Sequence, residues 1–109
     1  MRNLTSKQYL LAALTDKVNE GDYEAVHELV NQGADVNGRD AVGDTPLLSA
    51  AWVGAANIVR LLIERGADIK AVGMQGKTAL QLAEEMEHDE RAVGHHEAAR
   101  ILKEAGTKL

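Results

Sequence analysis

A repeat of 33 residues constrains this sequence more than any other feature. The segment GADV at 33–36 recurs as GADI at 66–69, and GDTPL recurs as GKTAL at the same offset. When residues 21–53 are aligned with 54–86, ten positions are identical, most of them glycines, helix-capping residues or small apolar residues. Stacked copies of one structural unit share such positions, so the sequence predicts a short repeat array.

The spacing of glycines indicates one helix of each unit. Three pairs of glycines lie twelve residues apart, at 21 and 33, at 54 and 66, and at 94 and 106. Between the members of each pair, apolar residues recur at helical spacing and form a single stripe. We expect Asp22 to be the N-cap of the first of these helices. We expect Gly33, Gly66 and Gly106 to end the three helices in a left-handed conformation.

A second helix in each unit has its own start signal. Thr45 followed by Pro46 is typical of an N-cap and a first helical position, where proline loses no hydrogen bond. Residues 40–43 before them have the composition of a turn. Each unit is therefore predicted to run turn, helix, turn, helix, and the fold class to be all-α.

This pattern resembles the ankyrin repeat. The resemblance rests on GDTPLLSAAWVGAANIVRLLIERGADIKA at 43–71, on EGDYEAVHELVNQGADVNGRD at 20–40, and on GKTALQLAEE with GHHEAARILKEAG within 76–106. It implies a solenoid of helix-turn-helix units whose short β-hairpin-like turns project to one side and serve as a protein-binding surface. We expect a single domain over 1–109 with units of approximately 5–40, 41–73 and 74–106.

The two ends of the array depart from the repeat. The first unit lacks a Thr-Pro start, and residues 5–8 (TSKQ) instead resemble a capping box that begins a longer helix through Val18. Lys103 stands where the second unit has Ile63, so the last helix has a more polar outer face. Both features are typical of terminal units that close a solenoid.

The turns also depart from the family pattern. The usual His after Thr-Pro-Leu is replaced by Leu48 and Gln81, which puts its hydrogen bonds between turns in doubt. Gly73 replaces Asp40 in the third unit, and we expect a less constrained turn there. The third unit carries seven extra residues between Ala83 and Gly94. We expect about one additional helical turn in this insert, followed by a loop that returns to Gly94.

Composition and motifs exclude several classes of function. The chain has no cysteine, which excludes disulfides, thiolate zinc sites and cysteine nucleophiles. A net charge of −5 argues against nucleic acid as a partner. No stretch is apolar enough to span a membrane or to serve as a signal peptide, so we expect a cytoplasmic protein. Nucleotide-binding, hydrolase and metalloprotease motifs are missing, so we expect no enzyme and no cofactor.

Histidines offer one alternative chemistry. His88, His95 and His96 lie in or beside the insert together with carboxylates, a set of ligands that suits zinc or nickel. The alternative, without metal binding, is a solvated acidic loop with histidines at a helix start. We expect His27 to lie alone on the exposed side of its helix.

The resemblance implies which residues face the groove. In ankyrin-like stacks the groove is lined by the turn tips and by the two positions after the Ala-Ala pair. Carried over to this sequence, the expected partner-binding residues are Ala41, Val42, Asp44, Trp52, Val53, Met74, Gln75, Lys77, Glu85 and Met86. In the first unit the corresponding residues are Asn19 and Glu20, with Gln8 and Tyr9 less defined. Alternatively, Trp52 only covers a neighbouring unit, and Met74 and Met86 only fill gaps.

Together these features predict a non-catalytic module that binds a protein or peptide through the concave groove around Trp52, and that is a monomer. An apolar strip with charges at its rim suggests a contact site, and Trp is enriched among residues that dominate binding. The alternatives are a metal-binding accessory protein that uses the insert, and an inhibitory subunit of an enzyme or toxin encoded nearby.

Overall fold

Three antiparallel helix pairs stack side by side in the computed structural model, which describes residues 6–89 and 93–107. The helices in the described residues are α1 (Ser6–Glu20), α2 (Tyr23–Asn31), α3 (Pro46–Val53), α4 (Ala56–Glu64), α5 (Ala79–Met86) and α6 (His95–Thr107). In these ranges the only β pairing is an isolated antiparallel bridge between Val72 and Thr78. The predicted all-α class is confirmed.

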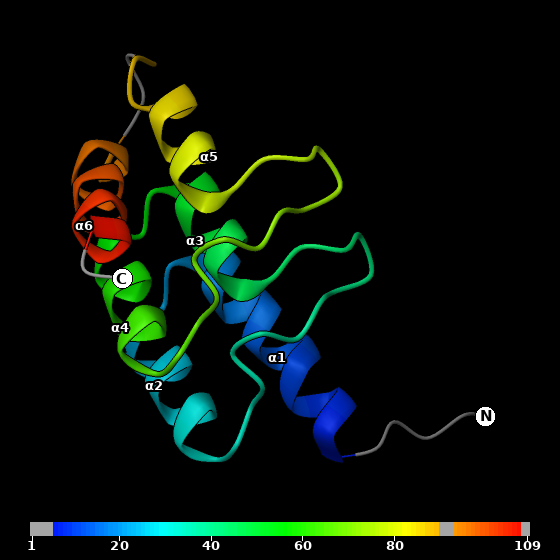
Figure 1. Cartoon of the computed structure of the whole chain (residues 1–109). Helices are drawn as coiled ribbons and strands as arrows, with labels where there is room; N and C mark the ends of the chain where they lie inside the picture. The colour runs from blue at the N-terminus through cyan, green and yellow to red at the C-terminus, as the bar shows by residue number, and fades with distance from the viewer. Residues whose placement is uncertain (1–5, 90–92, 108–109) are drawn as a thin grey trace.

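The helices form two rows (Figure 1). One row contains α1, α3 and α5, the other contains α2, α4 and α6, and the long turns that precede α3 and α5 project away from the second row. The helix α3 packs against α1, α5, α4 and α6, so it lies at the centre of the array. The sequence predicted the helix pairs, and the resemblance to the ankyrin repeat implied that the turns project to one side.

Local capping sets most helix ends as expected. The Asp22 side chain accepts a hydrogen bond from the backbone N–H of Ala25, and Thr45 accepts one from Leu48. Gly33 and Gly66 adopt positive φ angles of 101° and 92° beyond the ends of α2 and α4. The same expectation is wrong for Gly106, because α6 continues through it to Thr107 and no described segment after it has to turn back.

The first helix is the longest, at 15 residues, and runs past Val18 as predicted. Thr5, the proposed start of its capping box, lies outside the described residues.

The expected extra helical turn in the insert is wrong. The helix α5 ends at Met86, the position equivalent to the end of α3 at Val53, and Asp89 N–H then donates to the Met86 carbonyl in a non-helical turn. A further α-helical turn would carry the chain about 5 Å away from the start of α6, which must lie against α3 and α4. The extra length therefore lies in the connection between Met86 and Gly94, of which residues 90–92 are outside the described part.

Aliphatic side chains of both rows form one continuous core. Its largest fully buried members are Leu14, Val18, Val26, Leu47, Leu48, Ile58, Val59 and Leu62, and small alanines such as Ala50 and Ala51 lie between them. Small residues let the helix rows approach closely, while Leu, Ile and Val supply the apolar area that stabilises the stack.

Ion pairs link the last two outer helices. Glu97 on α6 pairs with Arg60 on α4 at 3.6 Å and with Arg100 one turn later. The hydrogen bond from Arg100, assisted by the charges of Arg100 and Arg60, lowers the pKa of Glu97. Because the pKa of Glu97 is lower in the folded state, its ionised form stabilises the folded protein. This stabilisation is fully present above the ordinary pKa of Glu and is lost as the pH falls through the folded-state pKa. Because the pair is exposed, its effect on stability is small.

The backbone at Gly54 comes into direct contact with the loop before α6. Gly54 has a φ of 78°, and a Cβ placed on it would overlap the Val93 carbonyl oxygen and lie 2.6 Å from the His95 ring. A Cβ on Gly94 would in turn overlap the Gly54 carbonyl oxygen. Only glycine permits this approach between the second and third helix pairs.

We expect Gly54→Ala to destabilise the protein more than Gly21→Ala does. Both glycines have positive φ, but a Cβ on Gly21 meets no atom within 4 Å. Gly21→Ala should therefore cost only the backbone strain, about 1 kcal/mol, whereas Gly54→Ala should cost about 1–3 kcal/mol more from overpacking. Urea denaturation of both variants measures the difference, and equal losses would contradict the proposed contact.

Candidate functional site

Two hairpin-like turns, at 40–44 and 73–77, precede the inner helices α3 and α5. Asp40 N–H donates to the Asp44 carbonyl at 2.9 Å, and Gly73 N–H donates to the Lys77 carbonyl at 3.3 Å. The second turn therefore keeps the backbone bond of the first, although Gly73 replaces Asp40. It loses only the two hydrogen bonds that the Asp40 carboxylate accepts, at 3.0 Å each, from the N–H groups of Val42 and Asp44.

Side chains just before the first turn connect it to the segment that leads into the second turn. The Arg39 guanidinium donates to the carbonyls of Gly43 and Val72, at 2.6 and 2.8 Å. Asn37 donates to the Gly66 carbonyl at 3.2 Å and accepts from the Asp68 N–H at 2.7 Å. These bonds hold the turns together without the histidine that the family uses.

The two replacements of that histidine have other roles. Leu48 is buried in the core, and Gln81 completes a capping box with Thr78 at the start of α5.

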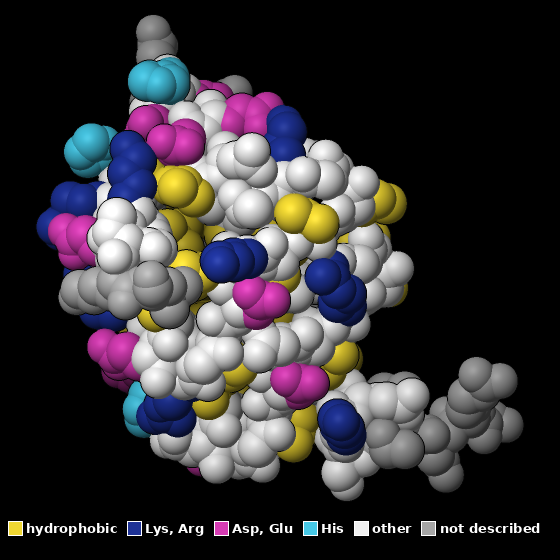
Figure 2. Space-filling view, viewed as in Figure 1, with side chains coloured by type: hydrophobic (Ala, Val, Ile, Leu, Met, Phe, Trp, Pro, Cys, Tyr) yellow, Lys and Arg dark blue, Asp and Glu magenta, His cyan; other side chains and the backbone are white. Residues whose placement is uncertain are grey.

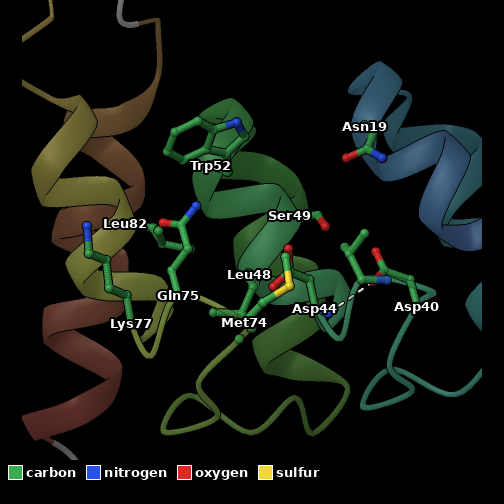
Figure 3. Close-up of a pocket in the computed structure, with 12 residues that line it drawn as sticks. Asn19, Asp40, Asp44, Leu48, Ser49, Trp52, Met74, Gln75, Lys77 and Leu82 are labelled. Carbon is green, nitrogen blue, oxygen red and sulfur yellow. Dashed lines mark hydrogen bonds between the residues drawn. The ribbon is translucent and has the colours of Figure 1, made fainter.

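An open pocket of about 300 Å³ lies between the turns and the inner helices (Figure 3). Its lining residues are Asn19, Asp40, Val42, Asp44, Leu48, Ser49, Trp52, Gly73, Met74, Gln75, Lys77 and Leu82. Leu48 and Leu82 are buried, so they form an apolar floor. The pocket contains six of the ten residues carried over from the resemblance, and also Asn19 of the first unit.

The other four expected residues lie outside this pocket. Ala41 is exposed on its turn, and Met86 is half-buried at the end of α5. Val53 lines a separate hollow with Glu20 and Asn57. Glu85 does not line the pocket but forms an ion pair with Lys77 at 2.5 Å. Gln8 and Tyr9, on the exposed side of α1, also lie outside.

Sequence reasoning missed five lining residues: Asp40, Leu48, Ser49, Gly73 and Leu82. Asp40 and Gly73 are the first residues of the two turns, and their positions in the sequence indicate only a role in forming these turns. Ser49 lies three residues before Trp52 on α3, so helical spacing could have identified it.

Three apolar side chains remain exposed around the pocket. Met74 is 76% exposed, Val42 is 53% exposed and Trp52 is 46% exposed. Met74 therefore fills no gap in the core, and about half of the Trp52 side chain remains accessible.

A buried histidine positions the backbone under Trp52. His95 is only 6% exposed, and its Nε2 lies 2.8 Å from the Trp52 carbonyl oxygen, to which it can donate. Its Nδ1 is buried without a hydrogen-bond partner. The inner position of His95 removes it from the proposed metal-ligand set.

His88 and His96 instead lie on either side of Glu87. Their ring nitrogens are 3.8 and 3.4 Å from its two carboxylate oxygens. No group of three His, Cys, Asp or Glu side chains in the described ranges has the arrangement of a metal site.

His27 is not alone, contrary to expectation. Its ring stacks with Tyr23 at a centroid distance of 6.1 Å, and its nitrogens lie 3.3 Å from Asn31 Nδ2 and 3.4 Å from an Arg65 guanidinium nitrogen.

Charges of both signs are mixed on the surface. Figure 2 shows lysines and arginines scattered among acidic side chains on the face in view, without a continuous basic patch there. None of the helices in the described residues is both long and apolar enough to cross a bilayer.

Comparison with known proteins gives one family. A model described as ankyrin repeats, in three copies, matches residues 10–109. Human protein phosphatase 1 regulatory subunit 27 is 46% identical over 66 residues, which cover 61% of this chain and 43% of that protein. Human ankyrin repeat and KH domain-containing protein 1 is 34% identical over 99 residues, 89% of this chain and 4% of that protein. The rice potassium channel AKT1 is 37% identical over 73 residues, 67% of this chain and 8% of the channel. The chain thus spans less than half the length of these curated relatives.

We expect His95→Ala to reduce the free energy of unfolding by about 2–4 kcal/mol, because it leaves the Trp52 carbonyl without a donor and creates a cavity. His96→Ala is the matched control: its side chain is 87% exposed, so its effect should be within about 0.5 kcal/mol. Thermal and urea unfolding measure both effects. Equal stability of the two variants would show that His95 does not hold this backbone.

Proposed function

Because the chain belongs to the ankyrin-repeat family, we propose that it binds a partner protein or peptide, without catalysing a reaction, through the pocket around Trp52. Ankyrin repeats are generally protein–protein interaction modules. The observation that carries the choice of surface is the exposure of Trp52, Val42 and Met74 around one pocket. Exposed apolar side chains grouped in this way indicate a contact surface.

The pocket is suited to binding because its walls are already held in place. Arg39 fixes the two turns to one another, and His95 fixes the backbone at Trp52. A surface that does not have to become ordered on association loses less conformational entropy. An indole beside an apolar floor is the kind of side chain on which binding energy concentrates.

The same pocket is poorly suited to catalysis. Its titratable side chains are Asp40, Asp44 and Lys77, and the ammonium of Lys77 is paired with Glu85. General acid–base chemistry needs a group tuned by an enclosed environment, which an open pocket between two turns does not supply.

We also propose that the module acts as a monomer in the cytoplasm, since without cysteines the fold does not depend on an oxidising compartment.

Substituting Trp52 and Val42 together by Ala should weaken binding of a partner by at least about tenfold while leaving the thermal unfolding temperature nearly unchanged. Both side chains are exposed, so their loss removes contact area without opening the core. The measurement is quantitative affinity capture from native lysate, followed by titration of the captured protein. Tyr9→Ala is the control, because Tyr9 is exposed on α1 away from the pocket. Equal capture by the double variant and by the wild type would refute the proposed surface.

A second proposal is that the partner is an enzyme that the module regulates. It is favoured by the 46% identity with a protein named as a regulatory subunit of protein phosphatase 1.

We expect the purified chain to change the activity of the protein phosphatase 1 catalytic subunit toward a phosphorylated protein substrate, and the Trp52→Ala, Val42→Ala double variant to lose this effect. A phosphatase titration with increasing amounts of each chain is the measurement. No change at micromolar concentrations would rule out this enzyme as the regulated partner and leave the binding surface to be tested by capture.

A further inference from the structure

We propose that the segment bound in this pocket carries a lysine or arginine next to an apolar side chain, and that its cation bonds to the Asp44 carboxylate. The inference depends on the proposed function and specifies the chemistry of the partner. It follows from the charges that the pocket leaves uncompensated.

Asp44 is a half-buried carboxylate on the pocket wall, at the junction of the first turn and α3. Gly73 of the second turn lies against it so closely that a Cβ there would overlap Asp44 Oδ1. In the described part of the chain, this carboxylate has no hydrogen-bond donor and no ion-pair partner. A partly desolvated carboxylate gains most from a charged donor, since charge-assisted bonds are about twice as strong as neutral ones.

The neighbouring charges do not neutralise Asp44. Asp40 adds a second negative charge, and its Oδ1 is already occupied by two backbone N–H groups. Lys77 is held by Glu85 at 2.5 Å. The Arg39 guanidinium is directed to two backbone carbonyls at the base of the turns. The pocket therefore attracts a cation from outside, and it disfavours acidic peptides and nucleic acid.

Apolar surface lies next to this carboxylate. In Figure 3, Met74 is drawn beside Asp44, and Leu48 lies next to them on α3, the helix that also carries Trp52. A free metal ion or a simple amine would leave this surface uncovered. A peptide segment that places an apolar side chain against Trp52 and Met74, with a basic residue beside it, covers the surface and pairs with the charge.

The test uses a display library of random linear peptides, selected on the whole chain and counter-selected on the Trp52→Ala variant. Peptides that depend on Trp52 should be enriched in Lys or Arg adjacent to an apolar residue. Individual synthetic peptides are then titrated, with the emission of Trp52, the only tryptophan, as the signal of occupancy.

Asp44→Asn preserves the shape of the side chain and removes its charge. It should therefore lower the affinity for these peptides by about tenfold and reduce the salt dependence of their binding. Glu64→Gln is the matched control: it removes one charge from an exposed position at the end of α4, outside the pocket, and should leave affinity unchanged. Binding with Trp52 dependence but without enrichment of basic residues, or without an effect of Asp44→Asn, would overturn this inference and leave the proposed function intact. A selection that yields no Trp52-dependent peptide would overturn both.

Discussion

The approach of Gly54 to the loop before α6 is the contact on which the candidate site depends. Here the backbones of the second and third helix pairs touch, because neither Gly54 nor Gly94 carries a Cβ. The same contact brings His95 under the last turn of α3, where it can donate to the Trp52 carbonyl. This hydrogen bond holds the backbone of the residue whose side chain lines the pocket.

A second set of constraints acts on the turns. An array of helix pairs has no strand ladder to hold its turns, so their backbone groups need other partners. Arg39 and Asn37 supply these partners by bonding to carbonyl and N–H groups of the next turn. The pocket walls therefore become ordered when the protein folds. Less conformational entropy is then lost when a partner binds.

Helix caps could be predicted from the sequence because their hydrogen bonds join residues close together in the chain. Thr45 and Asp22 cap helices because each accepts a bond from an N–H three residues ahead, a contact that sequence spacing contains. The extra helical turn predicted in the insert is absent because helix length there depends on distant contacts, whereas Gly106 lies inside α6 because no described segment after it has to turn back. Helix-favouring residues after Met86 do not continue α5, since α6 has to return to α3 and α4.

In the candidate site too, some features could be predicted from the sequence and others could not. The resemblance to the ankyrin repeat implied that Trp52, Val42 and Met74 face the groove, and the structure has all three exposed around one pocket. Spacing did not indicate that Lys77 is paired with Glu85 or that the Asp44 carboxylate lies unpaired against the backbone of Gly73, because these contacts join different segments.

By itself, the sequence predicted the helix pairs, because a repeated pattern of glycines, caps and apolar stripes indicates a stack of units, and its resemblance to the ankyrin repeat implied the family and the face that carries the turns. The tertiary structure alone decided which of the three histidines near the insert is buried, where the insert leaves the helix, and which charges in the pocket remain without a partner. Those outcomes depend on contacts between different segments of the chain, such as that of His95 with the Trp52 carbonyl, across 43 residues.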